Sequence, residues 1–314
     1  MAKSNSNQLR RRVFLKTTLT GVAAITAGLI PGSTRAAESD PKRIAKATER
    51  KVELLFLGTG AADWPSKYPP ADMKLTRGQV RGTSSMLING HILIDCGPTV
   101  LDVMNRYKVN PAGITDLLLT HTHADHLHPE SVRTLADARD AKFGPLRIWA
   151  HPEALKRVPT SSRIETFPVE IGKPVMMHGF GMTGLEANHL VRTSKEKCLY
   201  YFIEGATKNF LYATDGSWLL KRTWLYLQKK RLDALVWDAT IGEGIGDYRI
   251  FEHNDLAMIR HMNQTLMNRN ILKSDAKIIL THMARTLHPS QDQLEKKLLP
   301  EGLIPAYDGM SLVL

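Results

Sequence analysis

A dense group of titratable residues follows a short apolar run in the stretch LLLTHTHADHLHPE, residues 117–130. The run Leu117–Thr120 is typical of a short buried strand, so the titratable residues begin where that strand leaves the core. They include the pattern His121-x-His123-x-Asp125-His126. Neutral imidazole and carboxylate are ligands that divalent transition metals favour. The types and spacing of these residues therefore predict a metal site.

Three more potential ligands stand where later apolar runs end: His189 closes GLEANH, Asp215 closes FLYATD and His282 closes IILTH. We expect the ends of these strands to converge on one edge. Seven nitrogen and oxygen ligands are enough for two metals that share a carboxylate and leave a position for water. Two such ions about 3.5–4 Å apart would lower the pKa of that water and stabilise charge in a displacement reaction.

Five other histidines are isolated, and we interpret them as solvated or core side chains: His91, His151, His178, His261 and His288.

Apolar runs alternate with helical patterns along the rest of the chain. We expect a hairpin at Asn89-Gly90, helices over residues 99–107, 217–231, 254–268 and 289–298, a helix beginning near Pro129, and a closing strand pair within 306–314. This order predicts two packed sheets with helices outside, in one sandwich domain spanning residues 52–314.

The amino terminus has the order of an export signal: arginines at 10–12, an uncharged stretch over 17–30, then small residues near Ala36. The pair Arg11-Arg12 before VFLK resembles a twin-arginine signal, so we expect residues 1–36 to engage the twin-arginine translocation machinery and direct the protein to the periplasm. An ordinary signal or a retained anchor is the alternative. The apolar stretch is shorter than the roughly 20 residues of a membrane span, so no stable span is expected. Residues 37–51 form a lead-in.

The net charge of +11 suggests nucleic-acid binding only while the first 36 residues are counted. Their removal leaves 36 basic against 31 acidic residues, a net charge of +5. We therefore expect no nucleic acid among the partners. The two cysteines, Cys96 and Cys198, are either bridged or buried thiols, and their spacing does not decide. The sequence is compatible with a homodimer but does not determine the assembly.

HTHADH together with His189, Asp215 and His282 resembles the metallo-beta-lactamase-fold hydrolases, and the resemblance covers residues 52–314. It implies an α+β fold, the four-layer alpha-beta/beta-alpha sandwich, with two divalent ions. Zinc is expected, although manganese or iron would accept the same ligands. By this resemblance Asp215 bridges two ions. One ion takes His121, His123 and His189, and the other takes Asp125, His126 and His282.

The motifs FLGTGAA, RGTSSMLI, ILIDCGP, LYATD and ILTHM resemble the branch that holds ribonuclease Z and the phosphoribosyl cyclic phosphate phosphodiesterases. WDAT at 237–240 and HNDL at 253–256 resemble the latter, in which the histidine protonates the leaving oxygen. This resemblance suggests that His253 is a general acid and that Asp238 orients it. An alkoxide is a poor leaving group, and an imidazolium near neutral pH can supply its proton. The alternative is that His253 only begins a helix.

The chain departs from those phosphodiesterases in two places. The loop after the first strand lacks their zinc-binding cysteines, and Arg285 stands where a second histidine is usual. The loop instead offers residues that suit an anionic, ring-bearing molecule, unless they are simply solvated: Trp64, Tyr68, Lys74, Arg77 and Arg81.

We therefore predict a metal-dependent phosphodiesterase that acts on a small, anionic, cyclic or nucleotide-like diester through a metal-activated hydroxide. One alternative is a carboxylic ester or lactone hydrolase with the same metals. The other is a metal or cofactor carrier without catalysis.

Overall fold

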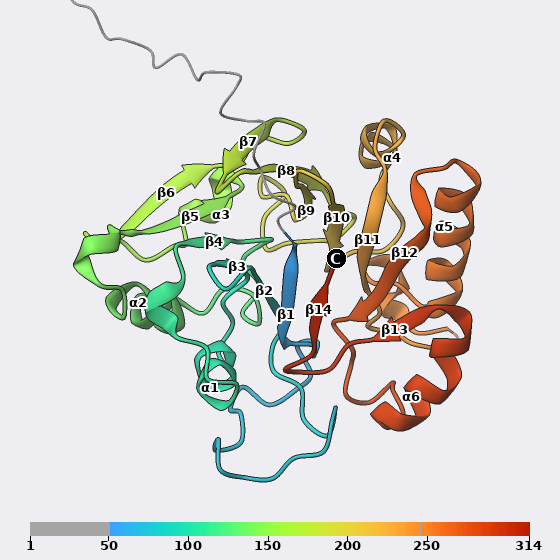
Figure 1. Ribbon diagram of the computed structural model, residues 1–314, viewed down its shortest axis with the longest axis horizontal. Helices are drawn as coiled ribbons and strands as arrows, with labels where there is room; N and C mark the ends of the chain where they lie inside the picture. Colours follow the sequence, from blue (N-terminus) through green and yellow to red (C-terminus); the bar gives the residue numbers. More distant parts are fainter. Residues whose placement is uncertain (1–50, 245) are drawn as a thin grey trace, which may run out of the picture. The chain divides into compact units, whose positions relative to one another are not determined.

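The computed structural model describes residues 51–244 and 246–314, whose strands form two seven-stranded sheets (Figure 1). The first sheet has the order β14 (Ser311–Val313), β1 (Glu53–Gly58), β2 (Ser85–Ile88), β3 (Ile92–Ile94), β4 (Asp116–Leu118), β5 (Leu146–Ala150) and β6 (Ile164–Pro168). The second has the order β13 (Leu303–Pro305), β12 (Leu272–Thr281), β11 (Leu232–Asp238), β10 (Asn209–Ala213), β9 (Leu199–Glu204), β8 (Phe180–Glu186) and β7 (Pro174–Met177). The predicted export signal, residues 1–36, lies outside the described residues, as does most of the lead-in over 37–51.

The two sheets pack face to face, and the alternation of side chains along each strand explains why. In β11 every residue is buried. Ala234 and Val236 belong to the core between the sheets, whereas Leu235 and Trp237 belong to the core on the opposite face of the second sheet. Since successive side chains point to opposite faces, a strand that is apolar at every position must be covered on both sides.

Helices supply the outer cover of each sheet. The first sheet is covered by α1 (Val100–Arg106), α2 (Pro129–Asp137) and α3 (Pro152–Leu155). The second is covered by α4 (Lys221–Leu227), α5 (Leu256–Asn268) and α6 (Gln291–Leu298). Short 3-10 helices span Pro111–Gly113, Ala141–Phe143, Tyr248–Phe251 and Leu299–Glu301. The predicted four-layer sandwich is confirmed.

The hairpin between β2 and β3 turns at Asn89 and Gly90, as predicted. Both residues have positive φ, 49° and 73°, the backbone conformation that a two-residue hairpin turn requires. Cys96 and Cys198 are both buried and form no disulfide.

Two local predictions are wrong. The helix expected over 217–231 is limited to α4, because Ser217 is held in a loop by hydrogen bonds with Asn188 and the Phe251 carbonyl. The expected closing strand pair does not form either. β14 pairs with β1 in the first sheet, whereas β13 pairs with β12 in the second. The chain crosses from one sheet to the other between these strands, so they are not neighbours.

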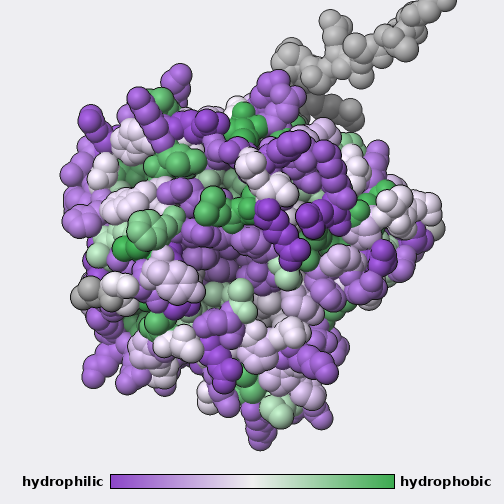
Figure 2. Space-filling model, turned by 180° about the vertical axis from the view of Figure 1, so that it is seen from behind, coloured by the Kyte–Doolittle hydropathy of each residue, from purple (hydrophilic) through white to green (hydrophobic). Residues whose placement is uncertain are grey.

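Most of the face drawn in Figure 2 is hydrophilic, with hydrophobic surface in separate patches. Among the described residues, we find no helix with the length and apolar character needed to cross a membrane.

Candidate metal centre and active site

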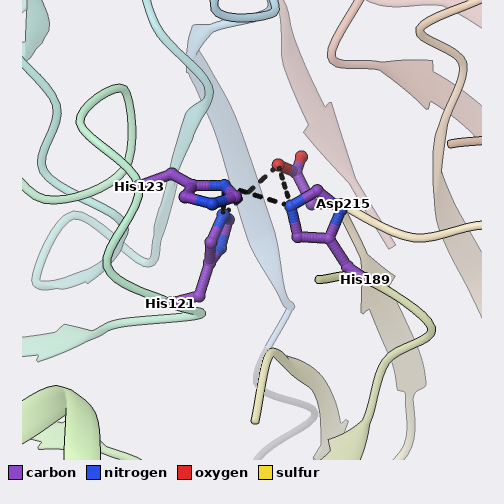
Figure 3. Close-up of side chains that lie close together, drawn as sticks. All are labelled: His121, His123, His189 and Asp215. Carbon is purple, nitrogen blue, oxygen red and sulfur yellow. Dashed lines mark hydrogen bonds and ion pairs between the residues drawn. The ribbon is translucent and has the colours of Figure 1, made fainter. Parts of the chain in front are cut away.

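Four predicted ligands from three parts of the chain meet in one group. His121 and His123 follow β4, His189 follows β8 and Asp215 follows β10 (Figure 3). One ligand atom from each lies within 4.8 Å of the others. His121 Nε2 lies 2.9 Å and His189 Nε2 lies 3.1 Å from His123 Nδ1. These nitrogens converge as the ligands of a single ion do.

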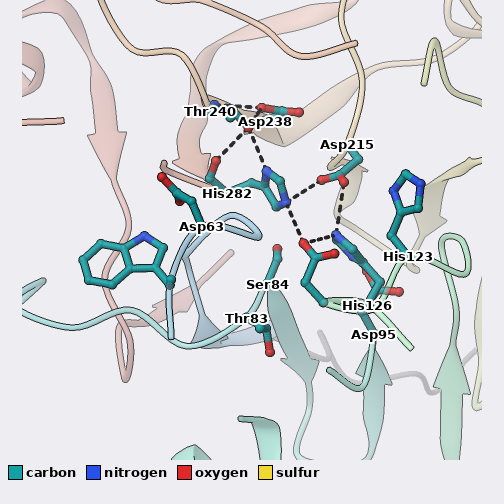
Figure 4. Close-up of polar contacts among 12 residues, drawn as sticks. Asp63, Thr83, Ser84, Asp95, His123, His126, Asp215, Asp238, Thr240 and His282 are labelled. Carbon is teal, nitrogen blue, oxygen red and sulfur yellow. Dashed lines mark hydrogen bonds and ion pairs between the residues drawn. The ribbon is translucent and has the colours of Figure 1, made fainter. Parts of the chain in front are cut away.

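A second group shares Asp215 with the first. Asp125, His126, Asp215 and His282 also place ligand atoms within 4.8 Å of one another. Asp215 Oδ1 lies 2.9 Å from His282 Nε2, and its Oδ2 lies 3.1 Å from His126 Nε2 (Figure 4). The same Oδ2 lies 3.5 Å from His121 Nε2. The Asp215 carboxylate therefore stands between the two groups, where a bridging ligand would stand.

Ligand atoms of the second group lack the hydrogen-bond partners that buried polar atoms normally have. Within the part of the chain that the structure describes, His126 Nε2, His282 Nε2 and Asp215 Oδ1 are buried without one. An orphaned buried polar atom costs about 1–3 kcal/mol, so several facing one another indicate a missing partner. The donor set of neutral imidazoles and carboxylates fits divalent metal ions.

Acceptors outside the group orient three of the imidazoles. His126 Nδ1 donates to Asp95 at 2.7 Å, His282 Nδ1 donates to Thr240 Oγ1 at 2.7 Å, and His189 Nδ1 donates to the Glu252 carbonyl at 3.2 Å. Each bond leaves the Nε2 lone pair facing the ligand group, which is the tautomer that a metal requires.

Asp95 and Thr240 were not predicted as site residues. Asp95 is fully buried in the motif ILIDCGP, at the end of β3. An acidic residue directly after an apolar strand was the available signal, and the same signal identified Asp215.

The electrostatics of the two groups differ. Burial lowers the pKa of His189 to about 4, even though Asp215 lies nearby. Burial also disfavours the charged form of His282, but Asp215 and Asp125 outweigh it and raise its pKa to about 10. The same balance raises the pKa of His126. Carboxylates thus make the His126–His282 side of the site favour positive charge, which a metal ion supplies.

Sharp backbone turns direct three site residues inward. Asp95, Asp215 and His282 have positive φ values of 60°, 35° and 56°. A non-glycine residue pays a steric cost in this conformation, and such strain clusters at functional sites.

His253 and Asp238 form a pair beside the ligands. His253 Nδ1 lies 2.6 Å from Asp238 Oδ2, and Asp238 is fully buried. The His253 ring stacks on His282 with centroids 5.4 Å apart, and its side chain is 14% exposed. Burial lowers the pKa of His253, but the Asp238 carboxylate outweighs it and raises that pKa overall. His253 and Asp238 could also hold an ion together with Asp215 and His282, since these ligand atoms lie within 4.8 Å.

Of the five loop residues predicted to suit an anionic, ring-bearing molecule, three line one cavity of about 700 Å³: Trp64, Arg77 and Arg81. Trp64 Nε1 donates to the Met283 carbonyl at 2.8 Å, and Arg77 Nη1 donates to Glu295 at 3.0 Å. Arg81 is only 3% exposed, and its guanidinium bonds internal groups that include Gln291. A role in substrate binding stays a prediction for all three.

The sequence profile of the "Beta-lactamase superfamily domain" matches residues 91–283, and the chain belongs to this superfamily. It is 28% identical over 168 residues to a ribonuclease Z from Exiguobacterium sp. (strain ATCC BAA-1283 / AT1b), a match that covers 52% of this chain and 49% of that protein. The chain thus spans about half the length, or less, of the curated relatives it matches.

Solved structures show the same fold. The metallo-beta-lactamase fold protein YhfI from Bacillus subtilis has a TM-score of 0.62 at 18% identity, over 84% of this chain and 100% of that chain. Unliganded yeast PDE1 has a TM-score of 0.62 at 12% identity, over 84% and 99%. Fold and family define the protein as a hydrolase of the metallo-beta-lactamase fold.

Proposed function

We propose that the protein is a binuclear metal-dependent phosphodiesterase that acts on a small cyclic or nucleotide-like diester. The observation that carries this proposal is the 2.6 Å contact between His253 and Asp238, directly beside a complete set of ligands. An ester whose leaving group departs unaided needs no such pair, whereas an alkyl phosphodiester does.

In this proposal one ion would be held by His121, His123 and His189, the other would be held by Asp125, His126 and His282, and Asp215 would serve both. Zinc suits these ligands, as do manganese and iron. When bound, two such ions lower the pKa of a water and stabilise the charge that develops on a phosphoryl group.

The chain itself supplies the proton for the leaving oxygen. Asp238 accepts a hydrogen bond from the Nδ1–H of His253, which keeps the ring oriented and favours its protonated form. The Nε2 proton then passes to the leaving alkoxide as the phosphorus–oxygen bond breaks, and solvent restores it. Asp238 is itself held in place, because it accepts from the Gly216 amide at 3.1 Å and from the Thr240 hydroxyl at 2.7 Å.

The test is the dependence of the His253→Ala effect on the leaving group. Turnover of an alkyl phosphodiester should fall by roughly 10² to 10⁴, the usual contribution of general acid-base catalysis. A nitrophenyl diester should lose much less, because its phenolate departs without a proton. Asp238→Asn should show a smaller loss with the same pattern.

Elemental analysis of His253→Ala provides the control, since both ions should stay bound. Equal losses for both substrates, or release of an ion, would instead make His253 a structural residue or a ligand.

A carboxylic ester or lactone hydrolase is the second candidate, because the same ligands would serve it. A screen of purified, metal-loaded protein against phosphodiesters, esters, lactones and lactams separates the two. A carrier without catalysis would turn over none of them.

Similarity to a ribonuclease also makes an RNA substrate worth including. We favour a small diester because the net charge of +5 after residue 36 provides little attraction for a polyanion.

We further propose export through the twin-arginine pathway, which rests on Arg11 and Arg12 in the sequence. Changing both to lysine keeps the charge but removes the guanidinium groups that a receptor can read. Periplasmic accumulation, measured by cell fractionation, should be lost. Unchanged accumulation would indicate an ordinary secretory signal.

A further inference from the structure

The cavity of about 700 Å³ lies between the loop that follows β1 and the segment that follows β12. Hydrogen bonds connect two of its lining residues to the segments that carry His282 and Asp238. Trp64 bonds the carbonyl of Met283, the residue after ligand His282, and Arg285 comes two positions later. On another side, His288 Nε2 donates at 2.8 Å to the carbonyl of Ala239, the residue after Asp238. Its volume is within the range of about 300–1,000 Å³ of small-molecule sites.

The three arginines that line this cavity are not equivalent. Arg81 is buried, and its guanidinium bonds Thr59, Gln291 and the Ala306 carbonyl. Arg77 forms a two-pronged bond with Glu295, at 3.0 and 3.1 Å. Both guanidinium groups are therefore already engaged by protein acceptors.

Arg285 differs from both. Its backbone amide donates to Asp63 at 2.9 Å, which fixes the position of the segment. Its side chain is exposed, and within residues 51–244 and 246–314 its guanidinium makes no ion pair of 4.0 Å or less. The guanidinium carbon lies 6.0 Å from the centroid of the Trp64 ring. A guanidinium that lies over an anchored indole, and has no ion-pair partner among the described residues, presents an anion-binding group next to a flat apolar surface.

We propose that this cavity binds the non-leaving part of a nucleotide-like diester, with Arg285 on a second phosphate and Trp64 against the planar ring. This inference rests on the proposed function and assigns the specificity of the same site. A guanidinium matches phosphate geometry with two parallel hydrogen bonds, and an aromatic ring stacks on any base.

Three substrates with the same nitrophenolate leaving group test the proposal in metal-loaded protein. They are methyl 4-nitrophenyl phosphate, whose non-leaving part has no ring, thymidine 5′-(4-nitrophenyl phosphate), and the same thymidine diester with a 3′-phosphate. Arg285→Gln should lower kcat/KM for the 3′-phosphorylated substrate by roughly 10- to 100-fold, as expected when a charged hydrogen-bond pair is lost. The other two substrates should change little.

Three further variants test whether the loss of kcat/KM belongs to Arg285 and to this cavity. Arg222 lies on α4, outside the cavity lining, and its guanidinium pairs with Glu186 at 2.7 Å. Arg222→Gln should therefore leave kcat/KM for all three substrates unchanged. Trp64→Leu should lower kcat/KM for both thymidine substrates by roughly 5- to 100-fold, the contribution of stacking one base, and should change that for methyl 4-nitrophenyl phosphate much less. If Arg77→Gln rather than Arg285→Gln removes the preference for the 3′-phosphate, the assignment to Arg285 is overturned.

Equilibrium binding separates this inference from the proposed function. Thymidine 3′,5′-bisphosphate, titrated calorimetrically, should bind wild type roughly 10- to 100-fold more tightly than Arg285→Gln, even if no diester is hydrolysed. Equal binding by both proteins would overturn the phosphate site. Absence of phosphodiester turnover with this difference intact would overturn only the proposed reaction.

Discussion

Two clusters of histidine and carboxylate lie at opposite ends of β4. Asp116 begins the strand, and the predicted ligand His121 follows its end. Asp116 is fully buried and accepts four hydrogen bonds at 2.6–2.8 Å, donated by Thr115 Oγ1, Arg147 Nη2, Trp149 Nε1 and His178 Nε2. Three of these donors contact Oδ2 and Trp149 contacts Oδ1, so both oxygens of this carboxylate have protein donors.

The metal edge contains the same residue types with the opposite balance. Asp215 Oδ1 and the Nε2 atoms of His126 and His282 face one another, and none of them has a hydrogen-bond partner among residues 51–244 and 246–314. Residue composition does not distinguish the two clusters. The ratio of donors to acceptors does, because a carboxylate saturated with donors is an internal ion-pair site, whereas converging acceptors require a cation.

The largest expected effect is that of Asp125→Ala. It deletes a ligand of the second group without touching the hydrophobic cores, so metal content should fall from two ions to one. Activity should fall by more than the roughly 10- to 100-fold typical of losing a residue that only supports a ligand. Elemental analysis measures the metal content, and turnover of a nitrophenyl diester measures the activity. Saturating metal that never exceeds one ion in wild type would contradict the binuclear centre.

Asp95→Asn should have an intermediate effect that is confined to one side of the centre. It weakens the acceptor that orients His126, so affinity for the second ion should drop roughly 10- to 100-fold while the first stays bound. Titration against a competing chelator resolves the two ions. Equal weakening of both would show that Asp95 supports the whole edge rather than His126.

Asp116→Asn should leave metal affinity unchanged and reduce stability instead. Loss of hydrogen bonds to a charged acceptor should lower the free energy of unfolding by roughly 1.5–3 kcal/mol, measured by urea denaturation. A change in metal content would remove the contrast between the two clusters.

The Asp116 cluster should also contribute to acid sensitivity. Burial opposes ionisation, but the hydrogen bonds from Arg147, Thr115, His178 and Trp149 outweigh it and lower the pKa of Asp116. Its stabilising contribution is therefore complete above the ordinary aspartate pKa of about 3.9 and is lost as pH falls through the lowered value. The difference in stability between wild type and Asp116→Asn should shrink over that acidic range. A constant difference would show that Asp116 is not ionised in the folded protein.

The sequence by itself determined the ligand types and the strands that carry them. The pattern at His121–His126, the strand ends at Asp215 and His282, and the hairpin at Asn89-Gly90 depend on neighbours within a few residues, and side-chain periodicity is a local property. The four-layer order follows from the same signals, because strands buried on both faces need two covering layers.

Only the tertiary structure decided which polar residues serve one another. Asp95 reaches His126 across 31 positions, and Arg81 reaches Gln291 across 210. No local pattern marks such pairs, so Arg81 could not be told from Arg285 in the sequence. The same limit applies to β13 and β14, which are close in the chain yet join different sheets. A short strand pairs with the unpaired backbone N–H and C=O groups at the edge of a sheet. Those edges are formed by strands distant in the sequence, so they exist only once the sheets have formed.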